Sequence, residues 1–479
     1  MRRRPRPLAR PLARPLARPL ALLVALLSVA ACGGGVHGSP GASGLRDPYF
    51  PKLGNGGYDV THYSLNLAYD PDSHRLTGTA TLTATARQDL SAFNLDLRGL
   101  TVGGVTVDRK RARSQRAGSE LTIRPFDELP AGHTFRTVVR YSGEPVTITD
   151  PDGSEEGWLR TGDGALGLGE PTGSMAWFPG NHHPSDKATY TLAISVPAGV
   201  RAVSNGELRS AKRSAFGRST TYVWRVTRPM ASYVATVAIG DFRIRTSRTP
   251  DGIPVYTAVD PREEKASAKV LARLPEVVDW ETATFGPYPF SSTGAIVDRD
   301  GDAGYALETQ NRPVFPGAPR LGTLVHELAH QWYGDSVTPK SWRDMWLNEG
   351  FATYAEWLWE ERHGGDTAQR SFDDAYDHDA GSAVWAFPPA DPPGAAHISD
   401  APVYGRGAMV LHRVRETVGD PAFFALLKGW ATDHRYGNVD THDFTSYVER
   451  ENPAEKKALA EVWKDWLYGK GKPDEPDKS

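Results

Sequence analysis

The sequence of 479 residues contains a single cysteine, Cys32. One thiol cannot form an intrachain disulfide, and it cannot build a zinc cage from several cysteines. A metal site in this chain must therefore use histidine and carboxylate ligands.

Basic tracts are also scarce once the first 31 residues are set aside. Those residues carry seven arginines and no acid, so removing them takes the formal net charge from −3 to −10. An acidic chain without a basic tract has no surface for phosphate backbones, and we expect no nucleic-acid partner. Hydrophobic residues make up 39% of the chain, with 13 tryptophans, which is enough for a large core. The length suggests two or three domains.

The one long apolar run, Leu20 to Ala31, has the length of a signal peptide and is too short to span a bilayer. The residues V-A-A precede Cys32, an arrangement that resembles a bacterial lipoprotein signal with Cys32 as the lipidated first residue. Ordinary secretion with an incidental Cys32 is the alternative. We predict a signal peptide over 1–31 and a flexible Gly/Ser-rich tether over 32–46. The chain is then exported, either as a cell-envelope lipoprotein on the outer face of the cytoplasmic membrane or as a secreted protein.

The middle of the chain changes its periodicity once. Short runs such as YSLNLAY alternate apolar and polar residues from 58 to about 242, with turn residues between them. This pattern predicts an all-β domain over 47–245. Helical spacing begins in the segment 263–285, so we predict a second, mostly helical domain over 246–470 and a polar tail over 471–479.

The segment from Val325 to Tyr354 carries the chemistry. It contains H-E-x-x-H at His326, Glu327 and His330, and then, after eighteen intervening residues, Glu349. Positions i and i+4 of a helix lie on one face, so His326 and His330 can bind one metal ion. Glu349, on the helical stretch NEGFATYAEWLWEE, suits the third ligand, which leaves the fourth position of a zinc ion open for water or substrate. Glu327 is placed to reach such a water.

A solvated helix face with two histidines would match H-E-x-x-H equally well. The flanking residues favour a buried helix, because its other faces are apolar: Leu324, Val325, Leu328, Ala329 and Trp332. Buried histidines and carboxylates need partners, and one metal ion would satisfy all of them.

The stretch HELAHQWYGDSVTPKSWRDMWLNEGFATY resembles the signature of peptidase family M1, the aminopeptidase N-like zinc peptidases of the gluzincin type. The resemblance implies an α+β multidomain fold, with an N-terminal all-β domain followed by a thermolysin-like, mostly α-helical zinc metallopeptidase domain. It assigns one Zn²⁺ per chain to the ligands His326, His330 and Glu349, and the role of general base to Glu327. The chain resembles a short form without the large C-terminal helical domain of many members, and we expect a more open site.

Two further positions follow from the same resemblance. Glu356, seven residues after Glu349, matches a carboxylate that supports the ligands, although a solvated helix glutamate would fit as well. DAGYALETQNRP resembles the family's G-x-M-E-N exopeptidase strand, with Ala306 and Glu308 in corresponding places. A fixed carboxylate at Glu308 would pair with the substrate α-ammonium, and extended backbone here could pair with the peptide. The alternative for Glu308 is an exposed strand glutamate.

Glu170 and Tyr404 complete the candidate site. GLGEPTGSMAWFPGNHHPSDKATY is similar to a family stretch in which some members hold the substrate amine with a glutamate at the position of Glu170, although Leu168 replaces the usual glutamine. The alternative is a loop carboxylate.

APVYGRGAMVLH resembles the stretch that carries the family's catalytic tyrosine. A phenol at Tyr404 would stabilise an oxyanion, and a packed loop tyrosine is the alternative.

These residues predict a zinc metallo-aminopeptidase that hydrolyses the N-terminal bond of peptides with a free N-terminus, using an activated water. Three alternatives remain: an endopeptidase with the same zinc chemistry, a hydrolase of a non-peptide substrate, and a non-enzymatic envelope protein that keeps the fold for binding. The last would have no use for a general base. We expect a monomer whose membrane association, if any, is a lipid on Cys32.

Overall fold

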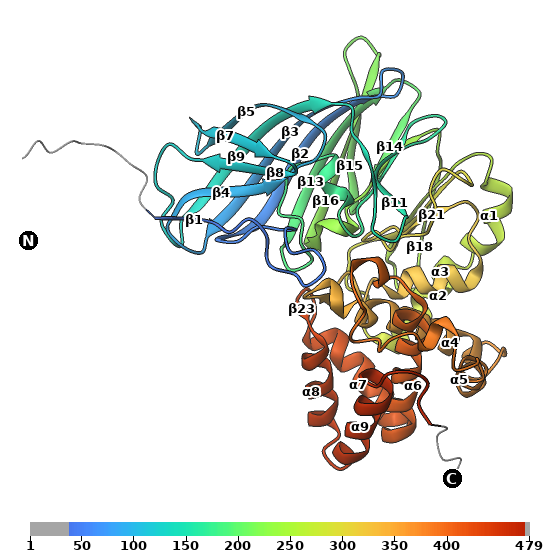
Figure 1. Cartoon of the computed structure of the whole chain (residues 1–479). Coiled ribbons are helices and arrows are strands. Elements are labelled where there is room, and N and C mark those ends of the chain that lie inside the picture. The colour runs from blue at the N-terminus through green and yellow to red at the C-terminus, as the bar shows by residue number, and fades with distance from the viewer. Residues whose placement is uncertain (1–37, 475–479) are drawn as a thin grey trace, which may run out of the picture. The chain divides into compact units, whose positions relative to one another are not determined.

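The computed structural model describes residues 38–474, so the predicted signal peptide and Cys32 lie outside the described residues. Strands dominate the first half of this range and helices the second (Figure 1). The predicted order, a β-rich domain followed by a mostly helical one, is confirmed. Among residues 38–474, no helix combines the length and the apolar character needed to cross a bilayer.

The largest sheet has eight strands in the order β15-β16-β13-β2-β3-β9-β5-β6. Its strands are β2 (Tyr58–Asp70), β3 (Arg75–Ala86), β5 (Thr101–Val107), β6 (Lys110–Arg111), β9 (Thr134–Gly143), β13 (Lys187–Pro197), β15 (Glu207–Arg213) and β16 (Ser219–Ala231). The alternation in YSLNLAY places Tyr63, Leu65 and Leu67 on the buried face of β2. Strand β13 runs parallel to β2, and the Tyr63 ring stacks on Tyr190 with centroids 4.9 Å apart.

Two smaller sheets complete the β-rich half. One has the order β10-β11-β12-β17-β14, made of β10 (Thr147–Thr149), β11 (Glu155–Arg160), β12 (Ala165–Leu168), β17 (Val237–Gly240) and β14 (Arg201–Ser204). The other has the order β1-β4-β8-β7, made of β1 (Ser39–Pro40), β4 (Leu90–Asp96), β8 (Glu120–Arg124) and β7 (Arg113–Ala117). Trp158 on β11 packs against Trp177, which follows a short 3-10 helix (Gly173–Ala176), with the two rings 6.3 Å apart.

A four-stranded sheet leads from the β-rich half into the helical half. It has the order β18-β19-β20-β21, made of β18 (Arg243–Arg248), β19 (Pro254–Val259), β20 (Thr293–Asp298) and β21 (Val314–Pro316). The predicted domain boundary at residue 246 falls within β18. Between β19 and β20 the expected helix over 263–285 is present as two helices, α1 (Glu264–Leu271) and α2 (Leu274–Phe285).

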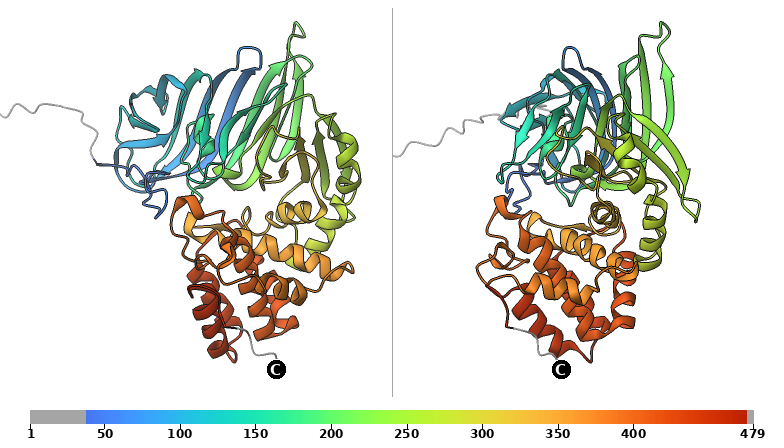
Figure 2. Two further views of the ribbon diagram at one scale, coloured as in Figure 1. Left: turned by 45° about the vertical axis from the view of Figure 1, so that its right-hand side comes forward. Right: turned by 90° about the vertical axis from the view of Figure 1, so that its right-hand side faces the viewer.

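The helical half contains seven further helices in the described residues. They are α3 (Leu321–Ala329), α4 (Trp346–Arg362), α5 (Ala368–Tyr376), α6 (Gly407–Val418), α7 (Asp420–Asp433), α8 (Thr441–Glu451) and α9 (Lys456–Val462), and two short strands, β22 (Thr338–Pro339) and β23 (Asn438–Val439), pair beside them. In both views of Figure 2 these helices gather on one side of the large sheet. The composition of 372–399, rich in aspartate, alanine, proline and aromatic residues, predicts a loop, but the first residues of this stretch complete helix α5.

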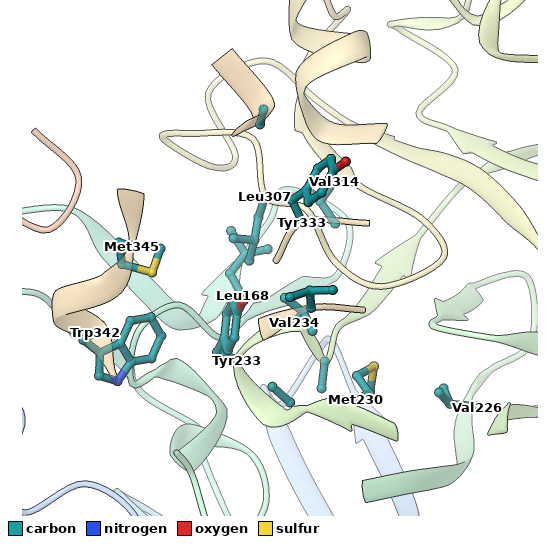
Figure 3. Close-up of a cluster of buried hydrophobic side chains, with 14 of the residues drawn as sticks. Leu168, Val226, Met230, Tyr233, Val234, Leu307, Val314, Tyr333, Trp342 and Met345 are labelled. Atoms are coloured by element: carbon teal, nitrogen blue, oxygen red, sulfur yellow. The ribbon is translucent and has the colours of Figure 1, made fainter. Parts of the chain in front are cut away.

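Buried side chains hold the two halves together. Figure 3 shows Leu168 and Val234 from the β-rich half beside Leu307 from the loop that precedes β21, with Met345 nearby. The ammonium group of Lys187 donates to the carbonyl oxygens of Asp335 and Ser336 at 2.9 Å, and burial lowers the pKa of this lysine to about 7. These contacts fix the β-rich half against the loop that follows α3.

Helices α4 and α6 approach each other closely at two glycines. A Cβ atom at Gly350 would lie 3.0 Å from the carbonyl carbon of Gly407, and one at Gly407 would lie 3.1 Å from the Cα of Gly350. Backbone atoms on both sides leave no flexible side chain to yield. The glycine of N-E-G therefore lets α6, and Tyr404 just before it, come close to Glu349.

The substitution Gly350→Ala is expected to lower both stability and kcat/KM. Overpacking costs about 1–3 kcal/mol, and the gain of about 1 kcal/mol in helix propensity offsets only part of it. Chemical denaturation and steady-state kinetics measure the two effects. Gly381→Ala is the control, because nothing lies within 4 Å of its added Cβ. A Gly350→Ala protein as stable and active as the parent would contradict this account.

Candidate active site

Helix α3 presents the two histidines of H-E-x-x-H on one face. Their rings lie 4.8 Å apart with an interplanar angle of 78°. The remaining faces of α3 are covered, since Leu324, Val325 and Leu328 are fully buried. The helix is therefore buried, as its apolar flanks predicted, and the solvated alternative does not apply.

Glu349 reaches both histidines from the first turn of α4. Its Oε2 atom lies 3.1 Å from Nε2 of His326 and 3.4 Å from Nε2 of His330. Ligand atoms of these three residues all lie within 4.8 Å of one another. Two imidazole nitrogens and one carboxylate oxygen around one point are the donor set of a catalytic zinc site.

Each histidine is held by an acceptor on its other ring nitrogen. Nδ1 of His326 lies 2.8 Å from Oε1 of Glu356, and Nδ1 of His330 lies 3.0 Å from the carbonyl oxygen of Tyr333. With Nδ1 donating, each Nε2 is directed toward Glu349 and becomes a metal ligand when a cation displaces its proton. The site thus fits zinc by donor type and by ring orientation, and Glu356 lies where the resemblance placed it.

The charges of the three ligands depend on one another. Burial would raise the pKa of Glu349, but the imidazoles of His330 and His326 outweigh it and hold that pKa at about 2. Burial would lower the pKa of His330, and the carboxylates of Glu349 and Glu308 raise it to about 10 instead. Glu349 is therefore ionised, and a divalent cation competes with protons for the same nitrogens.

Glu327 and Tyr404 lie on the wall of the same cavity as the ligands. Burial raises the pKa of Glu327 to about 8. The Tyr404 ring lies 6.0 Å from the His326 ring and almost parallel to it, in a wider π-helical turn (Pro402–Arg406) that leads into α6. Burial and the carboxylate of Glu349 raise the pKa of the Tyr404 phenol well above its usual value, so the phenol stays protonated and can donate.

Glu308 and Glu170 lie next to the ligand set. Oxygen atoms of Glu170, Glu308 and Glu349 all lie within 4.8 Å of one another. Burial and the nearby carboxylates of Glu308 and Glu349 raise the pKa of Glu170 well above its usual value. The expected strand around Glu308 is wrong: in this segment only Leu307 forms a β-bridge, to Val314, and Glu308 is buried rather than exposed.

Asn348 is a contributor that sequence reasoning missed. Its Nδ2 atom donates to Oε1 of Glu308 at 2.9 Å, and both side chains are buried. Gln331 donates to the carbonyl oxygen of Glu308 at 3.3 Å. The asparagine stands directly before Glu349 in N-E-G, so one helical turn supplies both a metal ligand and the group that fixes Glu308.

The metal ligands and the candidate catalytic and substrate-binding residues line one cavity of about 300 Å³. It is lined by Glu170, Ala306, Glu308, Glu327 and Tyr404, by the three ligands His326, His330 and Glu349, and by the segments 150–154 and 395–399. Both halves of the chain therefore contribute to it.

The fold and the ligand set define a zinc metallopeptidase with a β-rich N-terminal domain. The chain matches the model of the peptidase M1 N-terminal domain over residues 60–234 and that of the peptidase family M1 domain over residues 320–466. It belongs to peptidase family M1, and zinc is the cofactor that the family and the donor set imply.

Solved structures cover nearly the whole chain. The M1 zinc metallopeptidase from Deinococcus radiodurans is 30% identical, with a TM-score of 0.81 over 89% of this chain and 97% of that one. A mutant of it, bound to a Tyr-Ser-Ala substrate, superposes with a TM-score of 0.82.

Curated relatives are longer. Aminopeptidase N of Streptomyces lividans is 26% identical over 60% of this chain and 36% of its own length. Tricorn protease-interacting factor F2 of Thermoplasma volcanium is 25% identical over 61% of this chain and 40% of its own length. The chain thus spans about 40% of the curated relatives' length.

We expect Glu356→Gln to weaken zinc binding by roughly 10–100-fold, because His326 loses the carboxylate that fixes its ring. Titration of the apoprotein against a competing zinc chelator measures the affinity without reference to activity. The control is Glu360→Gln, an exposed position on the same helix. Equal zinc affinity for Glu356→Gln and the parent protein would show that Glu356 does not orient the ligand.

Proposed function

We propose that this chain is a zinc-dependent aminopeptidase that hydrolyses the N-terminal bond of peptides. The observation that supports it best is the placement of Glu308 and Glu170 beside the ligand set. Carboxylates at that distance from the reacting bond bind a free α-ammonium, and they leave room for one residue between the amine and the scissile carbonyl. The named relatives include aminopeptidases, and a family member was solved with a tripeptide substrate.

The residues divide the chemistry among them. Bound zinc supplies a Lewis acid that polarises the scissile carbonyl and acidifies a water. Glu327 takes the proton of the attacking water and delivers it to the leaving amine. The phenol of Tyr404 donates a hydrogen bond to the oxyanion that forms on the carbonyl. Glu308, held by Asn348, keeps the substrate amine in place during both steps.

Aminoacyl amides with a free amine, compared with the same compounds N-acetylated, test this function on the full chain. We expect cleavage of the free amines only, and loss of cleavage with a zinc chelator.

Glu308→Gln should lower kcat/KM for free amines, because an uncharged amide binds the ammonium more weakly. Glu327→Gln should lower kcat by roughly 10²–10⁴-fold while zinc content stays unchanged. Cleavage of the acetylated set would instead indicate an endopeptidase and remove Glu308 as the amine anchor.

We also propose that the chain is exported and anchored through a lipid on Cys32. The support is the apolar run Leu20 to Ala31 followed directly by the only cysteine. Expressed in a bacterium that processes lipoproteins, the protein should incorporate labelled palmitate and sediment with membranes, and Cys32→Ser should abolish both. Unlabelled protein released into the medium by the parent chain would instead indicate ordinary secretion.

A further inference from the structure

The turn between β10 and β11 brings two acidic side chains to the active-site cavity. Asp150 and Asp152 both line it, on the five-residue connection 150–154. The amide of Asp150 donates to the carbonyl oxygen of Ser154 at 2.9 Å, and the amide of Gly153 donates to that of Asp150 at 2.9 Å. Gly153 has a φ of 91°, which a side chain would disfavour. The turn is thus closed by its own hydrogen bonds.

One oxygen of the Asp150 carboxylate is buried without a donor. The residue is only 8% exposed, and its Oδ2 atom has no hydrogen-bond partner in the described part of the chain. A buried carboxylate oxygen without a donor costs free energy unless a ligand supplies one. Asp152 is fixed beside it, since its Oδ1 atom accepts from the amide and hydroxyl of Ser154 at 2.9 and 2.7 Å.

Glu156, on β11, pairs with the carboxyl group of Asp150 but leaves its Oδ2 atom without a donor. Its carboxyl oxygens accept from the amide and hydroxyl of Thr172 and from the amide of Gly173, at distances of 2.6 to 3.1 Å. Burial raises the pKa of both carboxyl groups, that of Glu156 well above its usual value and that of Asp150 to about 7, so Glu156 retains a proton and Asp150 ionises as the pH rises through about 7. Asp150 is the member that faces the cavity.

The charged residues that line the cavity also favour a cationic group on the substrate. Six carboxylate residues line it: Asp150, Asp152, Glu170, Glu308, Glu327 and Glu349. Among the described residues, no lysine or arginine lines it. Burial raises the pKa of Glu170 and Glu327, so these two are not counted as negative charges near neutral pH. The wall still offers acidic groups and no basic side chain, so a further cation on the substrate is favoured over a further anion.

We propose that Asp150 and Asp152 select peptides whose N-terminal residue has a cationic side chain, arginine or lysine. The proposal rests on the proposed aminopeptidase function. The cavity of about 300 Å³ is at the small end of ligand pockets, so the side chain that shares it with the amine anchors belongs to the first residue. A long basic side chain places its charge at a distance from the α-ammonium, where the 150–154 turn lines the wall.

The test compares arginine with citrulline, which has nearly the same shape and no charge, as the N-terminal residue of aminoacyl amides. We expect the parent enzyme to show a higher kcat/KM for the arginine amide. Asp150→Asn should lower the arginine-to-citrulline ratio roughly tenfold, which corresponds to the loss of one charge-assisted contact. Asp152→Asn, on the more exposed residue, should lower it less. Leucine amide serves as the neutral reference, and the arginine and citrulline rates of each variant are expressed relative to its leucine rate.

Asp72→Asn is the matched control, because Asp72 is an exposed aspartate in the turn between β2 and β3. An arginine-to-citrulline ratio of one in the parent would overturn the proposal. An unchanged ratio in both folded variants would also overturn it, and would assign Asp150 to the carboxyl pair with Glu156 alone. If the enzymes still cleave free-amine substrates, either of these two results leaves the aminopeptidase function standing. Failure to cleave any free-amine substrate would contradict that function itself.

Dipeptide amides locate the preference. Arg-Ala and Ala-Arg amides should differ, with the basic residue favoured only in the first position. A preference that appears only for Ala-Arg would overturn the assignment to the N-terminal residue.

Discussion

One buried carboxylate, Glu349, faces two imidazole nitrogens where α3 and α4 meet, and the rest of the site is arranged around that contact. In the interior such groups are costly unless each is paired. The acceptors at Glu356 and Tyr333 fix the two rings so that both Nε2 atoms face the same carboxylate oxygen. The result is a set of three donors whose spacing suits a divalent cation.

The residues on either side of Glu349 bring further groups of the site close to it. Gly350 and Gly407 let α6 lie against α4, which brings Tyr404 to the histidines. Asn348, on the same turn of α4 as Glu349, holds the carboxylate of Glu308. Three consecutive residues, N-E-G, therefore supply an orienting amide, a metal ligand and a close helix contact, which explains why chemistry concentrates in so short a stretch.

The β-rich half is part of the active site as well as its support. Lys187 and the hydrophobic cluster of Figure 3 fix it against the helical half. Its loops then carry Glu170 and the acidic turn 150–154 to the cavity wall. In the proposed function, the helical half supplies the groups that act on the scissile bond, and loops of the β-rich half contribute to recognition of the residue that is removed.

The sequence by itself determined the order of the two domains and the candidate metal ligands, because both depend on local periodicity. Alternation in YSLNLAY defines a strand face, and the i, i+4 spacing of His326 and His330 defines a helix face, whatever the rest of the chain does. Only the tertiary structure decided how Asn348 holds Glu308, and that the turn 150–154 reaches the cavity. Those relations join residues 40 or more positions apart, and no periodicity within either segment encodes the contact. The expected strand at Glu308 was wrong for the same reason: the backbone of that segment is bonded to groups from elsewhere in the fold, since Gln310 donates to the carbonyl oxygen of Val234 and Gln331 donates to that of Glu308.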